Sequence, residues 1–263
     1  MDFRSLPALL GLLLLSAPLE PAHAQSAVVT DRPDVTNAPT TVPFGAFQME
    51  AGLEFARTRL AASPAERRLA VQGTLRAGLT DNLEARLDGE PLVRLRGPED
   101  ATDRGDLALG LKYRFLDSEE GRWWPALGLQ PFVKVPIADR PIGSERPDFG
   151  LVALASFDLP RHFELDLNAG LSAVGQRHPE GYLLQALVSG SLGLQLTDRL
   201  SPYAELFFAT RGERGGRDAL GFDTGVIYLL TRRVALDAAV QTSLTGRGPD
   251  YAFRGGLSVR FGR

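Results

Sequence analysis

The 263-residue sequence contains no cysteine. This absence excludes a disulfide framework, a cysteine-based metal site and a lipid anchor on an N-terminal cysteine. After residue 24 the sequence also lacks a run of the roughly 20 apolar residues that a membrane-spanning helix needs, so a helical membrane protein is excluded. The net charge is only −3. Nothing therefore attracts the chain to nucleic acid over long distances, and we expect no nucleic-acid partner.

The side chains that most often carry catalysis are scarce as well. Beyond residue 24 only two histidines remain, His162 in a predicted turn and His178 in a predicted loop. Neither lies on a predicted strand beside an outward-facing serine, so the pair that nucleophilic catalysis needs is not visible. The sequence shows no phosphate-binding glycine loop and no metal-ligand cluster. We therefore predict a protein that is not an enzyme, with no catalytic residue, no metal and no cofactor.

The N-terminus has the features of an export signal. Arg4 supplies the basic region, residues 6–17 form an apolar run, and Ala22-His23-Ala24 fits the cleavage rule. The alternative is an uncleaved anchor helix, for which the run is too short. Residues 1–24 are therefore predicted to be a cleaved signal peptide, and the mature chain would begin at Gln25.

The region that follows the signal peptide, residues 25–45, is rich in proline and threonine and has no periodicity. We predict an extended periplasmic lead-in. It either stays flexible in the periplasm or folds back against the domain that follows.

Residues 46–263 alternate apolar and polar side chains with a period of two, which is typical of strands with two unlike faces. The pattern predicts about twelve strands, mostly of about 10–14 residues. Short turns at 80–82, 160–162, 197–199 and 231–233 alternate with longer loops, which include 91–104, 137–147, 176–181 and 211–218. The strand at 124–135 is the weakest prediction, because Pro125 and Pro131 interrupt it.

Alternation alone does not say which face meets water. A soluble barrel packs its apolar face inward, whereas a membrane barrel turns that face outward to lipid. The aromatic residues of the apolar face cluster near strand ends, with Phe47, Phe115 and Phe261 at one boundary and Phe149 and Phe253 at the other. Such belts, and strands of this length, are typical of a bilayer.

We therefore predict an all-β fold for residues 46–263. It is an antiparallel transmembrane β-barrel of about 12 strands, with an N-terminal extended segment, in the outer membrane. The alternative is a secreted soluble β-sandwich or a lipocalin-like barrel.

Both ends of the mature chain resemble a known family. The stretches that carry the resemblance are Thr30-Asp31-Arg32-Pro33-Asp34-Val35-Thr36, residues 41–52, residues 225–237, Leu244-Thr245-Gly246 and Pro249-Asp250-Tyr251. They resemble the phenol meta-pathway (MetA-type) outer-membrane proteins, many of which are labelled as transporters. The resemblance implies an outer-membrane barrel and a role in small-molecule passage. It brings no established catalytic or binding residues, and its phenol label does not define a substrate.

The polar face of the predicted barrel carries basic residues on the earlier strands and acidic residues on the later ones. We predict that the following side chains line a pore: Arg76, Arg86, Lys112, Arg114, Glu164, Asp166, Glu205, Asp223 and Asp237. Opposed walls of this kind would orient polar solutes. The alternative is that the charges pair with each other and fill the lumen. Arg76 and Glu84, which flank one turn, are a candidate pair.

The last strand, residues 251–262, has a further pattern. Arg254, Gly256, Val259 and Phe261 fit the insertion signal of bacterial outer-membrane barrels, which runs polar, any, Gly, any, any, apolar, any, aromatic. The alternative is an ordinary edge strand. Gly262 and Arg263 extend beyond the usual terminal aromatic residue.

The function that the sequence favours is a passive channel or transporter for small molecules. One alternative is a narrow or plugged barrel that acts as a structural or adhesive protein through loops such as 97–104 and 211–217. An outer-membrane lipid-modifying enzyme is the less favoured class. The expected partners are outer-membrane lipid, the barrel-insertion machinery and a small-molecule solute. The sequence defines neither the solute nor the oligomeric state.

Overall fold

The computed structural model describes residues 27–60, 64–119 and 123–262, so the predicted signal peptide lies outside the described residues. The regular elements of this part of the chain are strands and one short 3-10 helix, η1. In chain order they are β1 (Phe47–Thr58), β2 (Glu66–Thr80), β3 (Leu83–Arg96), β4 (Ala101–Asp103), β5 (Leu107–Leu116), β6 (Ala126–Val135), β7 (Asp148–Leu159), η1 (Pro160–His162), β8 (Phe163–Arg177), β9 (Glu180–Leu194), β10 (Leu200–Ala209), β11 (Ala219–Thr231), β12 (Val234–Ser243) and β13 (Tyr251–Phe261). No helix among these residues is long and apolar enough to cross a membrane.

The strands form one closed antiparallel sheet. Each long strand pairs with its neighbours in the chain, and β1 pairs with both β2 and β13, which closes the barrel. The β1–β13 register runs from Phe47 opposite Phe261 to Arg57 opposite Tyr251. The short β4 pairs only with the far end of β3. The predicted barrel of 12 strands is therefore confirmed, with β4 as one extra strand.

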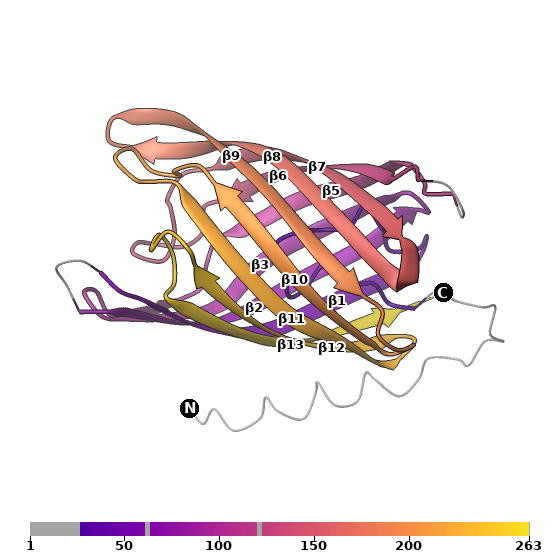
Figure 1. Cartoon of the computed structure of the whole chain (residues 1–263). Coiled ribbons are helices and arrows are strands. Elements are labelled where there is room, and N and C mark those ends of the chain that lie inside the picture. Colours follow the sequence, from indigo (N-terminus) through magenta and orange to yellow (C-terminus); the bar gives the residue numbers. More distant parts are fainter. Residues whose placement is uncertain (1–26, 61–63, 120–122, 263) are drawn as a thin grey trace, which may run out of the picture.

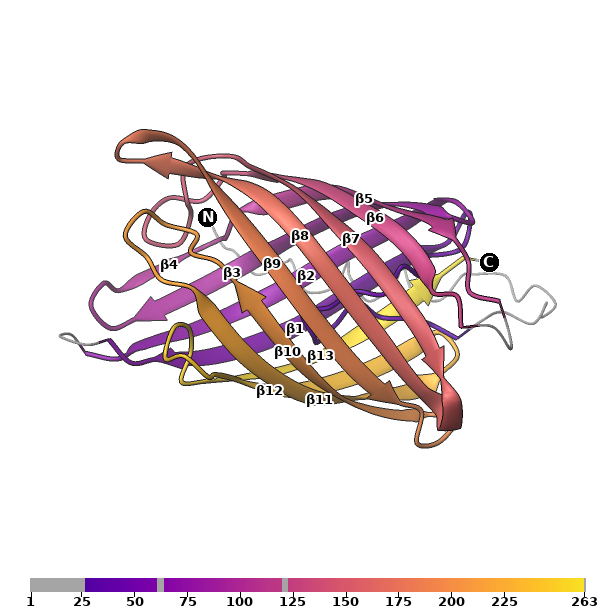
Figure 2. The same ribbon diagram turned by 45° about the horizontal axis from the view of Figure 1, so that its top comes forward.

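The two ends of the barrel differ in their connections. The tight turns after β2, β7, β9 and β11 lie at the end where the chain terminates, and most of the longer loops lie at the opposite end (Figures 1 and 2). The connection between β5 and β6 is the exception, because it is long and lies at the turn end. The predicted loop at 91–104 is partly wrong, because β3 continues to Arg96 and β4 pairs back on it. The inward side chains of Val93 and Leu95 pack there with Ala70, which holds this end of β3 in the sheet. The predicted loop at 176–181 is a tight turn between β8 and β9.

The weakest predicted strand, at 124–135, is present as β6, and Pro131 interrupts its pairing with β5. Between β5 and β6 the paired residues step from Gly110–Phe132 to Tyr113–Leu129, so the ladder is interrupted at the proline. On its other side Pro131 lies opposite Leu151 of β7. This follows from the missing N–H of proline, which removes a donor from one ladder.

The faces of the sheet are inverted relative to a soluble protein. The outward side chains include Phe47, Leu75 and Leu109, which are 62%, 52% and 53% exposed. The largest buried side chains are those of Arg76 and Lys112, which are 1% and 0% exposed. A soluble sandwich or lipocalin-like barrel buries its apolar face, so this arrangement excludes that alternative and is the arrangement of a transmembrane barrel.

Candidate functional site in the barrel lumen

Residues 27–45, the N-terminal segment, have no helix or strand and lie against the inner wall of the barrel. Their contacts reach β3, β8 and the turn between β11 and β12, on different sides of the barrel. Val28 N–H donates to the Arg232 carbonyl at 2.9 Å, and Asn37 N–H donates to Asn168 Oδ1 at 2.8 Å. Val42 N–H donates to Glu84 Oε2, also at 2.8 Å. Of the two alternatives that the sequence left open for this extended region, contact with the barrel is the one that the described residues show.

The strongest anchor of the N-terminal segment is Asp31. Its carboxylate accepts from Lys112 Nζ at 2.7 and 2.8 Å and from Arg86 at 2.7 Å, and it lies 3.3 Å from Arg76 Nη1. Burial alone would raise the pKa of Asp31, but the three cations together hold it well below its usual value. Asp31 therefore stays ionised and joins three basic side chains of β2, β3 and β5.

Arg76 also completes the pair that the sequence predicted. Its Nε lies 2.8 Å from Glu84 Oε1, and its Nη1 lies 2.9 Å from Glu50 Oε1. The Arg76–Glu84 pair across the β2–β3 turn is therefore confirmed. Glu50, on β1, is a further member of this cluster that the sequence analysis did not identify. Its place on the polar face of β1 was the signal that could have found it.

Arg32 turns to the acidic side of the lumen. Its guanidinium lies 3.4 Å from Asp237 of β12 and donates to Gln72 Oε1 of β2 at 2.9 Å. Two glycines opposite each other in the β1–β13 ladder, Gly52 and Gly256, make room for it. A Cβ at Gly52 would lie 2.1 Å from Arg32 Nη2, and one at Gly256 would lie 2.7 Å from Arg32 Nε. Only glycine therefore leaves space for the guanidinium in this position.

The next part of the N-terminal segment meets a second acidic residue. Glu205 of β10 accepts from the backbone N–H groups of Val35 and Thr36 at 2.9 and 2.7 Å, and from the Thr36 hydroxyl. Asp34 lies in the same region without a basic partner. Burial raises its pKa well above the usual value, and the neighbouring carboxylates of Glu205 and Asp166 add to this.

The remaining predicted pore residues do not all meet at one place. Asp223 pairs with Arg254 at 2.7 Å and accepts from the Tyr203 hydroxyl at 2.9 Å, inside the barrel. Glu164 accepts from the Ser156 hydroxyl at 2.9 Å. Arg114 lies near the turn end of β5, where it donates to the Asp81 carbonyl at 3.1 Å and pairs with Asp117. Arg114 is therefore apart from the charges that hold the N-terminal segment.

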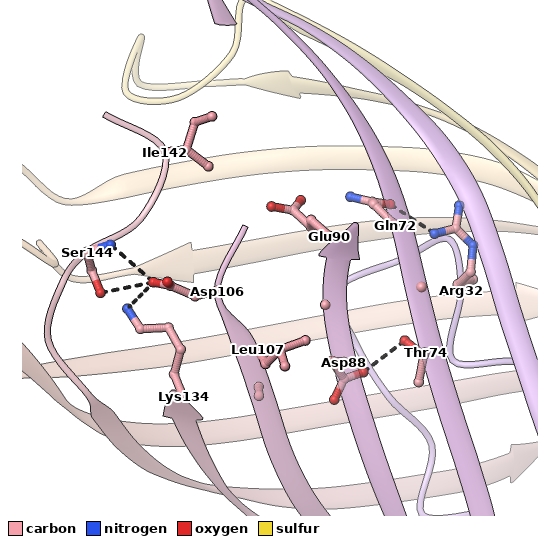
Figure 3. Close-up of a pocket in the computed structure, with 13 residues that line it drawn as sticks. Arg32, Gln72, Thr74, Asp88, Glu90, Asp106, Leu107, Lys134, Ile142 and Ser144 are labelled. Atoms are coloured by element: carbon pink, nitrogen blue, oxygen red, sulfur yellow. Dashed lines mark hydrogen bonds and ion pairs between the residues drawn. The ribbon is translucent and has the colours of Figure 1, made fainter. Parts of the chain in front are cut away.

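On the side of Arg32 that faces the long loops, the lumen opens into a cavity of about 480 Å³ (Figure 3). Charges of both signs surround it. Asp106 accepts from the backbone and the hydroxyl of Ser144 at 3.1 Å and lies 3.9 Å from Lys134 Nζ. Asp88 accepts from the Thr74 hydroxyl at 2.8 Å. A polar cavity of this size accommodates a small solute, with donors and acceptors on its walls.

Neither of the two histidines lines this cavity. His162 is the last residue of η1 at the turn end, and His178 lies in the β8–β9 turn at the opposite end. Both are exposed.

Comparison with known proteins places this geometry in context. A COG4313 outer membrane channel from Pseudomonas putida F1 is 16% identical, with 84% of this chain and 97% of that chain covered and a TM-score of 0.69. The NanC porin is 9% identical, with coverages of 81% and 98% and a TM-score of 0.55. The KdgM porin in complex with disordered oligogalacturonate is 8% identical, with coverages of 82% and 99% and a TM-score of 0.53. At these identities the likeness shows the fold.

The comparison of sequences is more specific than that of structures. No curated protein matches the chain. A family match, however, covers residues 30–261, which include most of the N-terminal segment and the whole barrel. This confirms the resemblance seen in the sequence: the chain belongs to the family described as "Putative MetA-pathway of phenol degradation".

Proposed function

We propose that the protein is a passive channel for small polar molecules in the outer membrane, and that the N-terminal segment narrows its lumen. The observation that carries the proposal is the polar cavity of about 480 Å³ inside a closed barrel, with the N-terminal segment at one end. A barrel that served only as a scaffold would gain nothing from a cavity lined with charged side chains, since buried charge is costly.

The charges of the lumen support a selective path rather than an open pore. Arg86 and Lys112 face Asp237 and Glu205 across the barrel, and the N-terminal segment lies between them. Its Asp31 binds the two basic residues and its Arg32 binds Asp237, while its backbone donates to Glu205. A solute that follows this path exchanges hydrogen bonds with fixed groups of both signs. We propose that these residues line the solute path. We assign no catalytic residue to it, because passage alone needs none.

The experiment that tests the proposal is single-channel recording of the purified protein in a planar bilayer. We expect discrete conductance steps smaller than those of an open porin, because the N-terminal segment occupies part of the lumen. Asp31→Asn removes the carboxylate through which the N-terminal segment binds three basic side chains of the barrel wall. Breaking a buried ionic cluster in this way costs about 3–5 kcal/mol, so the segment should leave the wall more often and the mean conductance should rise.

Asp34→Asn is the matched control. It removes a carboxyl group from the same segment at a site without a basic partner, so it breaks no ion pair and should not raise the conductance. If neither the wild-type protein nor Asp31→Asn conducts, while both run as folded barrels on a gel, the channel proposal is wrong and a structural or adhesive role gains support.

A further inference from the structure

The outward face of β1, β2 and β3 carries a row of arginines near the long-loop end of the barrel. In the sheet register Arg57 of β1 lies opposite Arg67 of β2, and Arg67 lies opposite Arg96 of β3. One step closer to the middle of the barrel, Phe55 lies opposite Leu69, and Leu69 lies opposite Arg94. The outward direction of this row follows from the exposed Phe55 and Leu69, because residues two apart share a face.

The arginines of this row repel each other unless an anion lies among them. Like charges directly opposite in a sheet are destabilising. Arg57 lies 3.3 Å from Asp250, and Arg96 lies 2.9 Å from Asp100. Arg67 and Arg94 are exposed and form no ion pair or side-chain hydrogen bond with any residue that the structure describes. The row therefore has an excess of positive charge, with free guanidinium groups at its centre.

The row of arginines lies at the edge of the apolar band of the barrel, at the long-loop end. Strands rise about 3.3 Å per residue, so at a tilt of about 40° Phe47 and Arg57 lie about 25 Å apart along the membrane normal. That distance is the height of the apolar band of a membrane barrel. Phe47 marks the turn end of the band, and outer-membrane barrels have their short turns in the periplasm and their longer loops outside the cell. The arginines, at the long-loop end, therefore lie at the level of the headgroups of the outer leaflet.

The surface below the arginines is suited to acyl chains. The next outward row toward the middle of the barrel is Leu53, Val71 and Leu92, and Leu53 and Leu92 are 57% and 45% exposed. Phe55 and Leu69 lie one row closer to the loops, level with Arg94 and below Arg57, Arg67 and Arg96. A ligand that covers the patch thus needs an anionic head at the arginines and an apolar tail along the strands.

We propose that Arg57, Arg67, Arg94 and Arg96 bind the phosphate groups of an anionic glycolipid in the outer leaflet. Guanidinium groups bind phosphate through paired hydrogen bonds, and the side chains on three adjacent strands can contact more than one phosphate of the same lipid. The site belongs to the outer surface and does not depend on whether the lumen conducts.

The test uses the full mature protein refolded in lipid-free detergent. Diphosphoryl lipid A is titrated in and the adducts are followed by native mass spectrometry. The variant is R67Q/R94Q, which removes the two unpaired guanidinium groups from an exposed surface. The matched control is R211Q/R217Q, which removes two exposed arginines from the β10–β11 loop. All forms are first checked for the gel-mobility shift of a folded barrel.

We expect R67Q/R94Q to bind diphosphoryl lipid A about tenfold more weakly than the wild-type protein, and R211Q/R217Q to bind it equally well. Monophosphoryl lipid A should bind the wild-type protein more weakly than the diphosphoryl form. Equal binding by R67Q/R94Q and the wild-type protein would overturn the proposal. So would full displacement of the lipid by millimolar inorganic phosphate, since the site would then take a free anion rather than a lipid.

Discussion

Asp31 and Asp34 lie close together on the N-terminal segment and meet opposite surroundings. Asp31 is ionised among three cations, and its lowered pKa means that its contribution is lost only in strong acid. The raised pKa of Asp34 means that its carboxyl keeps its proton to a higher pH in the docked segment than in a released one. The ordinary pKa of an aspartate carboxyl is 3.8. Above this pH the carboxyl of a released segment ionises more readily than that of the docked segment, so a rise in pH favours release.

This difference predicts a pH dependence of the channel. From pH 3.8 upward to the raised pKa of Asp34, a rise in pH weakens docking of the N-terminal segment, because the released carboxyl loses its proton before the docked one does. Mean conductance of the wild-type protein should therefore rise with pH across this window. Asp34→Asn has no proton to lose and should give a flatter profile. An unchanged slope in this variant, recorded in the same bilayers, would show that Asp34 is not the titrating group.

At the scale of elements, the β1–β13 ladder and the N-terminal segment depend on each other through Gly52 and Gly256. We predict that Gly52→Ala displaces Arg32, because the added Cβ would lie 2.1 Å from its Nη2. The Cβ would also lie 2.8 Å from the Gly255 carbonyl oxygen, so the β1–β13 ladder must shift slightly, and we expect the barrel to close around this shift. A single cysteine in place of Ala38, on the N-terminal segment, measures how exposed the segment becomes, since the chain has no other thiol. Its reaction with a maleimide should be faster in the Gly52→Ala background. Gly255→Ala is the control, because the nearest atom to a Cβ there is 3.6 Å away.

The strands could be predicted from the sequence, whereas the place of the N-terminal segment could not. Period-two alternation is a local signal, and it predicted even β6 in spite of Pro131. Arg32 and Asp237, by contrast, are 205 positions apart, and nothing near either residue indicates the other. The role of Gly52 and Gly256 becomes visible only when the register places them opposite each other. The charges near one turn, Arg76 and Glu84, could be paired because they are close in the chain.

For the molecule as a whole, the continuous ladder implies that the barrel does not need the N-terminal segment to fold. Deletion of residues 28–42 should leave the heat-modifiable gel shift intact, because all the strand pairs lie outside the deletion. The same deletion should raise the conductance and lower the denaturant midpoint, since Asp31 no longer compensates three buried cations. Loss of the gel shift would mean that the N-terminal segment is needed to assemble the barrel.

The pairing of β1 with β13 also gives the N-terminal segment a mechanical role. These two strands are the first and the last of the chain, and no loop joins them. Inside the lumen, the Thr30 hydroxyl bonds to Glu50 of β1 at 3.0 Å and to Ser258 of β13 at 2.8 Å. Arg254 of β13 donates to the Pro33 carbonyl at 3.1 Å. The N-terminal segment is thus a non-covalent cross-link between β1 and β13. Release of the segment removes this cross-link, so it should make separation of the two strands, and with it an opening of the barrel wall toward the lipid, easier.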